Sequence, residues 1–226
     1  MKTVEISNLH KSYESGGEKT KVLYDLDLSA LEGEMIMIMG PSGSGKTTLL
    51  NILGGIDAPD EGEVVVAENN LKSLSKKELN IYRRKNVGFI FQFYNLLPTL
   101  TARENVELGI ESIIKNKGEI RTRAENYLKL VGLGDKMDNF PQELSAGQQQ
   151  RVAIARALAK EPKIILADEP TGNLDEEREQ KIMDLMKRLQ HKHGITFFIV
   201  SHNPRLKKFM DKTYDLRMGK LHEMEA

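Results

Sequence analysis

The sequence contains no cysteine among its 226 residues, which excludes disulfide bonds and thiolate metal sites and fits a reducing compartment such as the cytosol. Its net charge is zero, because 33 lysines and arginines balance 33 aspartates and glutamates, so nothing indicates nucleic-acid or anionic-lipid binding across the whole surface. Apolar runs such as Met35–Met39 are too short to span a bilayer, and the first residues lack an apolar core of signal-peptide length. We therefore expect any membrane role to go through a partner protein.

Hydrophobic periodicity predicts one large α/β domain, for which this length is sufficient. Helical periodicity without a convincing strand runs from about 101 to 160, and apolar strands return afterwards on both sides of a helix, which predicts a parallel sheet. Capping-box pairs, Ser75 with Glu78 and Thr101 with Glu104, predict two helix starts. The expected strands are 3–9, 22–29, 34–39, 86–91, 163–167 and 195–200; the expected helices include 46–53, 148–160 and 176–192; and the expected exposed loops are 14–19 and 115–118.

A glycine-rich motif follows the expected strand at 34–39. It matches the pattern G-x-x-x-x-G-K-[ST] at a strand-to-helix junction, where glycines let backbone amides wrap a phosphate and the helix N-terminus adds positive potential. Lys46 would add a full charge, and Thr47 would hold Mg²⁺ through its hydroxyl. An ordinary Gly/Ser turn is the alternative, which the flanking strand and helix disfavour. The predicted phosphate-binding residues are Gly40, Pro41, Ser42, Gly43, Ser44, Gly45, Lys46, Thr47 and Thr48.

Two adjacent carboxylates follow the apolar run Ile164–Ala167. Ligands of open parallel sheets bind at the C-terminal ends of the strands, where Asp168 and Glu169 would be presented. The two acids would divide the work of phosphoryl transfer: Asp168 would orient Mg²⁺ and its waters, and Glu169 would polarise the water that attacks the γ-phosphate. Seen alone, the pair could be the exposed start of a loop. Beside a phosphate loop, it predicts nucleotide hydrolysis.

A second turn that contains glycine, Leu144–Arg151, narrows the class of protein. Together with the segment Asp-Glu-Pro-Thr-Gly-Asn-Leu-Asp at 168–175, it resembles the signature and the Walker B to D-loop segment of the ATP-binding cassette (ABC) ATPases. The resemblance implies that Ser145, Gly147 and Gln148 contact the γ-phosphate of an ATP held by a second copy of the chain. It therefore implies a homodimer that encloses two ATP molecules.

Three further residues take family roles from their positions between these motifs. The resemblance assigns Gln92 to the Q-loop that contacts Mg²⁺ and the attacking water, His202 to the switch histidine at the γ-phosphate, and Tyr13 to stacking on adenine. Seen alone, each is an ordinary strand-end or packing residue. Asp175 would cross the dimer interface, and it could also cap the helix that follows. The catalytic candidates are Glu169, His202 and Gln92, and the metal-ligand candidates are Thr47, Gln92 and Asp168.

The resemblance also implies a fold. We expect a P-loop NTPase with a mainly parallel sheet core, an N-terminal antiparallel β subdomain and an inserted helical subdomain. The core with its β subdomain would comprise 1–92 and 161–226, and the helical subdomain about 93–160. The common family form has glycine where this chain has Ala146, a change that is tolerated unless this position needs a positive φ.

The segments Phe91–Thr101 and Gly172–Asp175 are similar to the lipoprotein-releasing, macrolide and antimicrobial-peptide exporter ATPases. The resemblance implies a separately encoded transmembrane permease, contacted through about Phe93–Thr99, and a position at the cytoplasmic face of the cell membrane. The substrate would be a peptide, a lipoprotein or a drug-like molecule. A DNA-repair ATPase would need a long coiled-coil insertion, and a translation factor would usually carry two cassettes in one chain. This sequence shows neither feature, so no nucleic-acid partner is expected. Transmembrane signalling or force transmission by the same ATPase stays an alternative.

Overall fold

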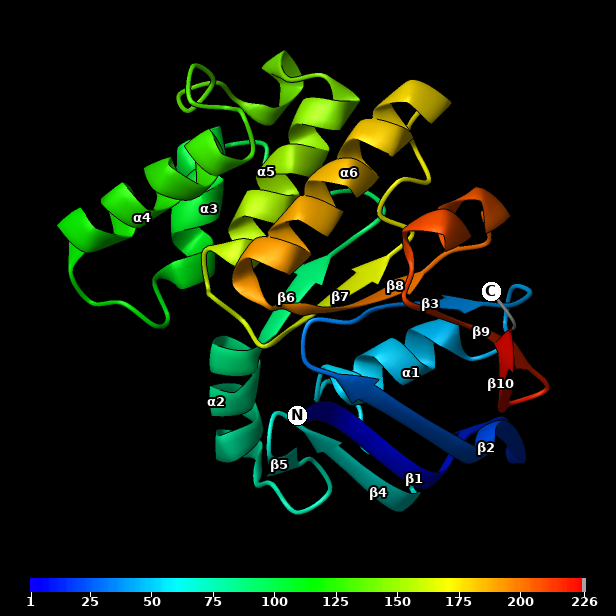
Figure 1. The fold of residues 1–226 in the computed structure, drawn as a ribbon. Coiled ribbons are helices and arrows are strands. Elements are labelled where there is room, and N and C mark those ends of the chain that lie inside the picture. Colours follow the sequence, from blue (N-terminus) through cyan, green and yellow to red (C-terminus); the bar gives the residue numbers. More distant parts are fainter. Residues whose placement is uncertain (225–226) are drawn as a thin grey trace.

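The computed structural model describes residues 1–224, and its larger sheet lies at the centre of the molecule (Figure 1). Its strands are β3 (Met35–Met39), β6 (Val87–Ile90), β7 (Ile164–Asp168), β8 (Thr196–Val200), β9 (Lys212–Arg217) and β10 (Lys220–Met224). They are ordered β10-β9-β3-β8-β7-β6; the pairs from β9 to β6 are parallel, and β10 is an antiparallel edge. The predicted α/β fold class with a mainly parallel sheet is confirmed.

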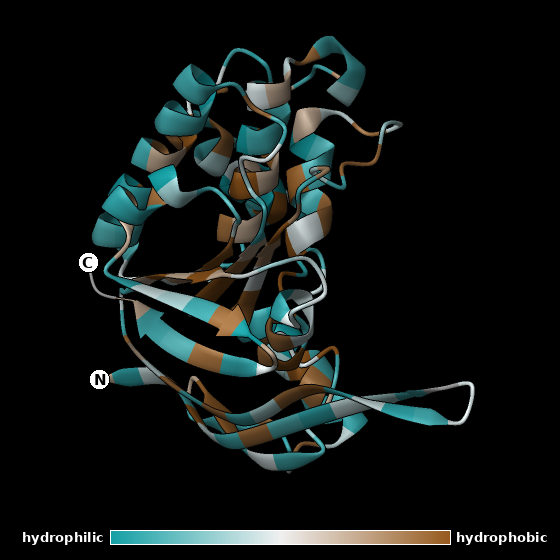
Figure 2. Cartoon of the chain, turned by 90° about the vertical axis from the view of Figure 1, so that its right-hand side faces the viewer, coloured by the Kyte–Doolittle hydropathy of each residue, from teal (hydrophilic) through white to brown (hydrophobic). Residues whose placement is uncertain are grey.

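Helices cover both faces of this sheet (Figure 1). They are α1 (Lys46–Leu53), α2 (Lys76–Asn86), α3 (Ala102–Ile110), α4 (Lys117–Leu130), α5 (Ala146–Leu158) and α6 (Glu176–His193), with short 3₁₀ helices at Pro141–Glu143 and Pro204–Phe209. Met35 and Met37 of β3 pack on the side of α5 and α6, whereas Ile36 and Ile38 pack on the side of α1. Because both faces are buried, β3 is continuously apolar instead of alternating. Figure 2 shows these strands as a hydrophobic layer.

A second sheet packs below α1 and carries the N-terminus (Figure 1). Its strands β1 (Lys2–Ser15), β2 (Glu18–Leu31), β4 (Glu61–Val66) and β5 (Asn69–Asn70) are antiparallel in the order β2-β1-β4-β5. The expected exposed loop at 14–19 is wrong, because the strands continue to a two-residue turn at Gly16 and Gly17. Their φ angles of 60° and 82° suit a tight hairpin. The hairpin projects from the molecule in Figure 2.

The stretch between β6 and β7 is helical, as the sequence predicts. Both expected capping boxes form, at the starts of α2 and α3. The expected loop at 115–118 is wrong in its second half, because Asn116 caps α4 and the helix begins at Lys117. Helix α5 begins at Ala146, two residues earlier than expected. None of the helices between residues 1 and 224 is long and apolar enough to cross a membrane. The division of the chain into a core and a helical subdomain stays a prediction.

Candidate functional site

Most of the predicted site residues follow the C-terminal ends of four neighbouring strands. The phosphate loop follows β3, Gln92 follows β6, Glu169 follows β7 and His202 follows β8. Since β3, β8, β7 and β6 are adjacent and parallel, their C-terminal ends lie side by side and form one edge of the sheet. Parallel α/β sheets bind their ligands at this edge.

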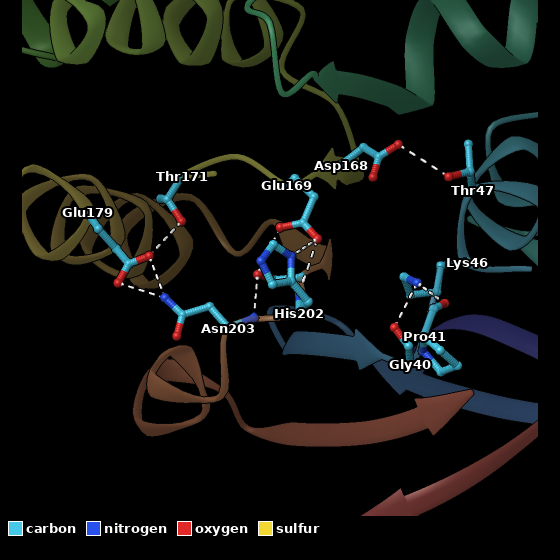
Figure 3. Close-up of polar contacts among 11 residues, drawn as sticks. Gly40, Pro41, Lys46, Thr47, Asp168, Glu169, Thr171, Glu179, His202 and Asn203 are labelled. Atoms are coloured by element: carbon cyan, nitrogen blue, oxygen red, sulfur yellow. Dashed lines mark hydrogen bonds and ion pairs between the residues drawn. The ribbon is translucent and has the colours of Figure 1, made fainter. Parts of the chain in front are cut away.

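The phosphate loop leads directly into α1. Gly45 precedes this helix with a φ of 102°, and a Cβ atom there would lie 2.8 Å from Leu23 Cδ2, so that only glycine fits. No side chain caps the helix, which leaves the first backbone N–H groups available to an anion. The buried Ser44 hydroxyl also has no hydrogen-bond partner in the described part of the chain. Lys46 Nζ donates to the carbonyl oxygens of Gly40 at 2.9 Å and Pro41 at 2.7 Å (Figure 3).

A pocket of about 680 Å³ opens over this edge. Thr47 Oγ1 lies 3.4 Å from Asp168 Oδ2 there, so two of the three predicted metal ligands meet (Figure 3), and Gln92 lines the same pocket. Burial raises the pKa of Asp168 and the neighbouring Glu169 charge adds to this, while Thr47 and Lys46 oppose it. The lining residues are Tyr13, Val22, Gly40, Ser42, Gly43, Gly45, Lys46, Thr47, Thr48, Gln92, Asp168, Glu169, Val200 and His202.

Glu169 is held in an unusual backbone conformation, with a φ of 46° in a residue that is not glycine. Such left-handed residues cost free energy and cluster at functional sites. Its carboxylate accepts the Ser201 hydroxyl at 3.1 Å and the His202 backbone N–H at 3.1 Å, and it lies 2.8 Å from His202 Nδ1. Glu169 and His202 both line the pocket, and the His202 side chain is 77% exposed.

Tyr13 lines the same pocket from the other sheet, near the tip of the β1–β2 hairpin. Its hydroxyl donates to Asp57 Oδ2 at 2.6 Å, and Lys11 Nζ lies 5.0 Å from the ring centroid and 2.8 Å from Asp57 Oδ1. Burial raises the pKa of the Tyr13 phenol, and the bond to Asp57 acts in the same direction. Partial burial of Asp57 would raise the pKa of its carboxyl group, but the hydrogen bonds from Lys11 and Tyr13 outweigh burial and lower this pKa. These contacts hold the ring in place.

The predicted signature residues do not line this pocket. Ser145 and Gly147 line another one, of about 490 Å³, which is formed by α5, α6 and the end of α4. Ser145 caps α5 and forms a capping box with Gln148, whose side chain accepts the Ser145 backbone N–H at 2.8 Å. Ala146 is the first helical residue and has no positive φ, which explains why alanine is tolerated where the family commonly has glycine.

The segment after Glu169 connects the site to α6. Asp175 caps α6 by accepting the backbone N–H of Arg178 at 2.9 Å, so the expected capping role is seen, whereas a role at a dimer interface stays a prediction. Asn173 Nδ2 donates to the backbone oxygen of Gln92 at 2.8 Å. This bond ties the segments that follow β6 and β7, two neighbouring strands, to each other.

Several residues of the site have no signal in the sequence. Ser201 and Asp57 position Glu169 and Tyr13, respectively, and both are ordinary loop residues when read locally. Val22 and Val200 line the pocket but belong to apolar strand patterns that predict only packing. Knowledge of which strands are neighbours would have identified Ser201, since the ends of adjacent parallel strands meet. Asp57 could be found only from the contact between its loop and β1.

Comparison with known proteins identifies the family. The family model described as "ABC transporter" matches residues 23–172, more than half of the chain. The chain belongs to the ABC transporter family. It is an ATP-binding cassette, an ATPase of the P-loop class that uses ATP and Mg²⁺.

Relatives of the cassette cover nearly all of it. An ABC transporter ATP-binding protein of Methanocaldococcus jannaschii is 49% identical, over 98% of both chains. The lipoprotein-releasing system ATP-binding protein LolD of Saccharophagus degradans is 43% identical, over 97% of this chain and 96% of its own. A solved structure, the dimeric post-hydrolysis state of the cassette MJ0796 bound to ADP and Pi, is 43% identical and superposes with a TM-score of 0.87 over 99% of both chains.

Proposed function

We propose that this cassette works as a dimer of two copies around two ATP molecules and energises a separately encoded membrane permease. The observation that carries the proposal is the placement of the phosphate loop and the signature turn. The phosphate loop shares a pocket with both carboxylates and His202, while the signature turn lies outside this pocket. A signature that binds the same kind of phosphate therefore needs a nucleotide from another copy.

Hydrolysis would proceed by attack of water on the γ-phosphate, with ADP as the leaving group. The Glu169 carboxylate would orient the water and accept its proton, because Ser201 and His202 hold it facing the pocket. Lys46 would turn from the carbonyls of Gly40 and Pro41 to the more strongly charged phosphate oxygens and neutralise them. Tyr13 would stack on the adenine.

The donor set fits Mg²⁺ but not an all-protein metal site. No cluster of three His, Asp or Glu side chains suited to a metal occurs in residues 1–224. Mg²⁺ needs few protein ligands, since it is usually held by one or two side chains together with water and substrate phosphates. Thr47, Asp168 and Gln92 would hold the ion, which would neutralise charge on the phosphates during the reaction.

The surroundings of Gly147 support the composite site. A Cβ atom at this position would meet Arg178 Cδ at 3.7 Å, an ordinary contact, and its φ is not positive. Nothing among residues 1–224 therefore demands glycine at position 147. Close approach of a nucleotide held by the second copy would demand it, since glycine lets a backbone come near a phosphate. The dimer of MJ0796, whose fold is the same, supports this arrangement.

The surface proposed to contact the permease is the segment Phe93–Thr99. Phe93 is 72% exposed and Leu97 is 46% exposed, although both are large and apolar. The backbone beneath them is fixed from inside: the buried Asn105 side chain binds both the N–H and the carbonyl oxygen of Leu97, and Arg156 binds the carbonyls of Tyr94 and Asn95. A rigid segment that exposes apolar side chains suits a protein partner.

Within the family, we propose the exporter branch and a place at the cytoplasmic face of the membrane. The identity to LolD, whose name describes lipoprotein release, supports an extracted or exported peptide, lipoprotein or drug-like substrate.

Co-purification from membranes would test the permease partner. The Phe93→Ser variant should lose a permease that the unaltered chain retains, while its ATP affinity stays the same. Retention of the permease by Phe93→Ser would reject this surface.

The Glu169→Gln variant tests the hydrolytic roles and the dimer together. We expect it to bind MgATP, to release no phosphate above background and to accumulate as a dimer in sedimentation experiments, because the amide cannot accept the proton of water. Lys46→Ala is the control that should bind no nucleotide and stay monomeric. Normal turnover by Glu169→Gln would reject its catalytic role, and a monomer at saturating MgATP would reject the dimer.

A further inference from the structure

A buried carboxylate lies behind the hydrolytic residues. Glu179, in the first turn of α6, is only 8% exposed and does not line the nucleotide pocket. Burial of a carboxylate is costly unless it is hydrogen-bonded. The start of α6 does not need this residue as a cap, because Asp175 already caps the helix. Glu179 is therefore held in the interior by other contacts.

Those contacts come from two loops that leave neighbouring strands. Thr171 Oγ1, from the loop after β7, donates to Glu179 Oε2 at 3.1 Å. Asn203 Nδ2, from the loop after β8, lies 3.0 Å from Oε1 and 2.8 Å from Oε2 (Figure 3). The nearest cation of the described chain is more distant, with Arg205 Nε 4.0 Å from Oε1. The carboxylate thus links the two loops through neutral donors.

Each loop carries one member of the hydrolytic pair. Thr171 lies two residues after Glu169, and Asn203 directly follows His202. The Asn203 backbone N–H also donates to Ser201 Oγ at 3.2 Å, and Ser201 in turn donates to Glu169 Oε2 at 3.1 Å. Glu179 is therefore connected to the Glu169 carboxylate by hydrogen bonds that run through the side chain of Asn203, its backbone N–H and the Ser201 hydroxyl.

We propose that Glu179 is a positioning residue for ATP hydrolysis. It fixes the separation of the loops that carry Glu169 and His202, and it couples this separation to the start of α6. Because α6 begins directly after Asp175, a displacement of Asp175 on dimer formation would move the start of α6. This movement would reach His202 through Glu179 and Asn203. The inference rests on the proposed hydrolytic roles of Glu169 and His202.

An exchange of donor and acceptor tests the link. Asn203→Asp places a second carboxylate against Glu179, and the repulsion should separate the loops. We expect kcat to fall on the order of tenfold, the scale of coupling between contacting buried groups, with an unchanged KM for MgATP because the phosphate loop is not altered. Adding Glu179→Gln restores a complementary pair with the original total charge: the new amide donates to the carboxylate introduced at position 203 and still accepts from Thr171.

The double variant should recover most of the lost kcat. Glu177→Gln is the matched control, since Glu177 lies in the same turn but is exposed and pairs with Lys181 on the surface. It should hydrolyse ATP at the original rate. Thermal unfolding of every variant separates the two roles: a merely structural residue would lower the melting temperature and leave kcat per folded molecule unchanged.

The outcomes are distinct. An unaltered kcat in folded Asn203→Asp, or no recovery in the folded double variant, would overturn the positioning role. If Asn203→Asp does not fold, Thr171→Val removes one hydrogen bond at constant shape; it should lower kcat several-fold, about the loss of one buried hydrogen bond, and an unchanged kcat would again overturn the role. Normal hydrolysis by Glu169→Gln would instead reject the proposed function itself.

Discussion

Helices α1 and α5 both begin at motifs that contain glycine, yet their N-termini are built in opposite ways. Before α1, Gly45 has a left-handed φ of 102° and no side chain caps the helix. Before α5, Ser145 has an extended backbone with a φ of −64° and forms a capping box with Gln148. The first four N–H groups of any helix lack partners within the helix, so each turn must satisfy them in some other way.

The difference indicates how each turn obtains its ligand. The turn before α1 leaves its N–H groups available to a phosphate, and Asp168 and Glu169, the carboxylates proposed to act on that phosphate, line the same pocket. The turn before α5 satisfies the N–H groups of Ser145 and Gln148 with its own side chains, so its cap forms without a ligand. We infer that the phosphate loop is a complete binding site within one chain, whereas the signature is a preformed surface that serves a second copy.

The largest effect should come from Gly45→Ala. The new Cβ would lie 2.8 Å from Leu23 Cδ2 on a backbone with positive φ, so the loop must distort and lose its phosphate geometry. We expect MgATP binding to be abolished in equilibrium titrations. Gly17→Ala is the control for strain alone, since it shares a positive φ but has open space around it. Normal binding by Gly45→Ala would contradict the assignment.

Gly147→Ala should separate binding from hydrolysis. The added methyl meets only Arg178 within the described chain, so we expect an unchanged melting temperature and unchanged MgATP affinity of the monomer. Phosphate release and dimer formation should both be lost, because the methyl would meet the nucleotide of the second copy. Full hydrolysis by this variant would contradict the inference that the signature turn serves the nucleotide of a second copy.

Tyr13→Ala tests whether the first site is complete up to the adenine. Loss of stacking should weaken MgATP binding by about 1–3 kcal/mol, as measured by calorimetry, with little change in kcat at saturation. Tyr13→Phe keeps the ring but loses the bond to Asp57, and it should lie between the two. Equal affinities for all three proteins would exclude stacking.

The smallest effect concerns the caps. Ser145→Ala and Ser75→Ala each remove the side chain of a capping box and should each lower the free energy of unfolding by about 1 kcal/mol. Only Ser145→Ala should also slow phosphate release, because Ser145 belongs to the signature proposed to meet the nucleotide of the second copy, whereas Ser75 belongs to neither the signature nor the nucleotide pocket. A parallel loss of hydrolysis in both variants would mean that the Ser145 effect is one of stability.

The sequence predicted the features that are local. The phosphate loop, the carboxylates after β7 and the capping boxes are short patterns whose chemistry is contained in neighbouring residues. Strands β4 and β5 were not predicted, because their edges are polar and they form through pairing with β1 and with each other. Local sequence predicts an exposed loop at 14–19 because this stretch is charged, although the Gly16-Gly17 pair is itself a hairpin signal.

The rest of the site depends on contacts across the chain. Ser201, Asp57 and Glu179 act through partners 32, 44 and 24 residues away, respectively, and none has an unusual local pattern. Their roles follow only when the strand order is known, since that order brings the loops after β7 and β8 together. Distant pairing of this kind is where sequence periodicity carries no information.

Both sheets contribute to the nucleotide pocket: Tyr13 belongs to the antiparallel sheet, and the phosphate loop follows β3 of the parallel one. A nucleotide that contacts both would add a bridge between two sheets that already share a hydrophobic core and a backbone hydrogen bond from Tyr24 to Gly219. Its binding free energy would then oppose their separation, by about 2.7 kcal/mol at a hundred times its dissociation constant. Each round of hydrolysis and ADP release would remove this bridge. The stability of the cassette against unfolding would therefore fall and recover once in every catalytic cycle.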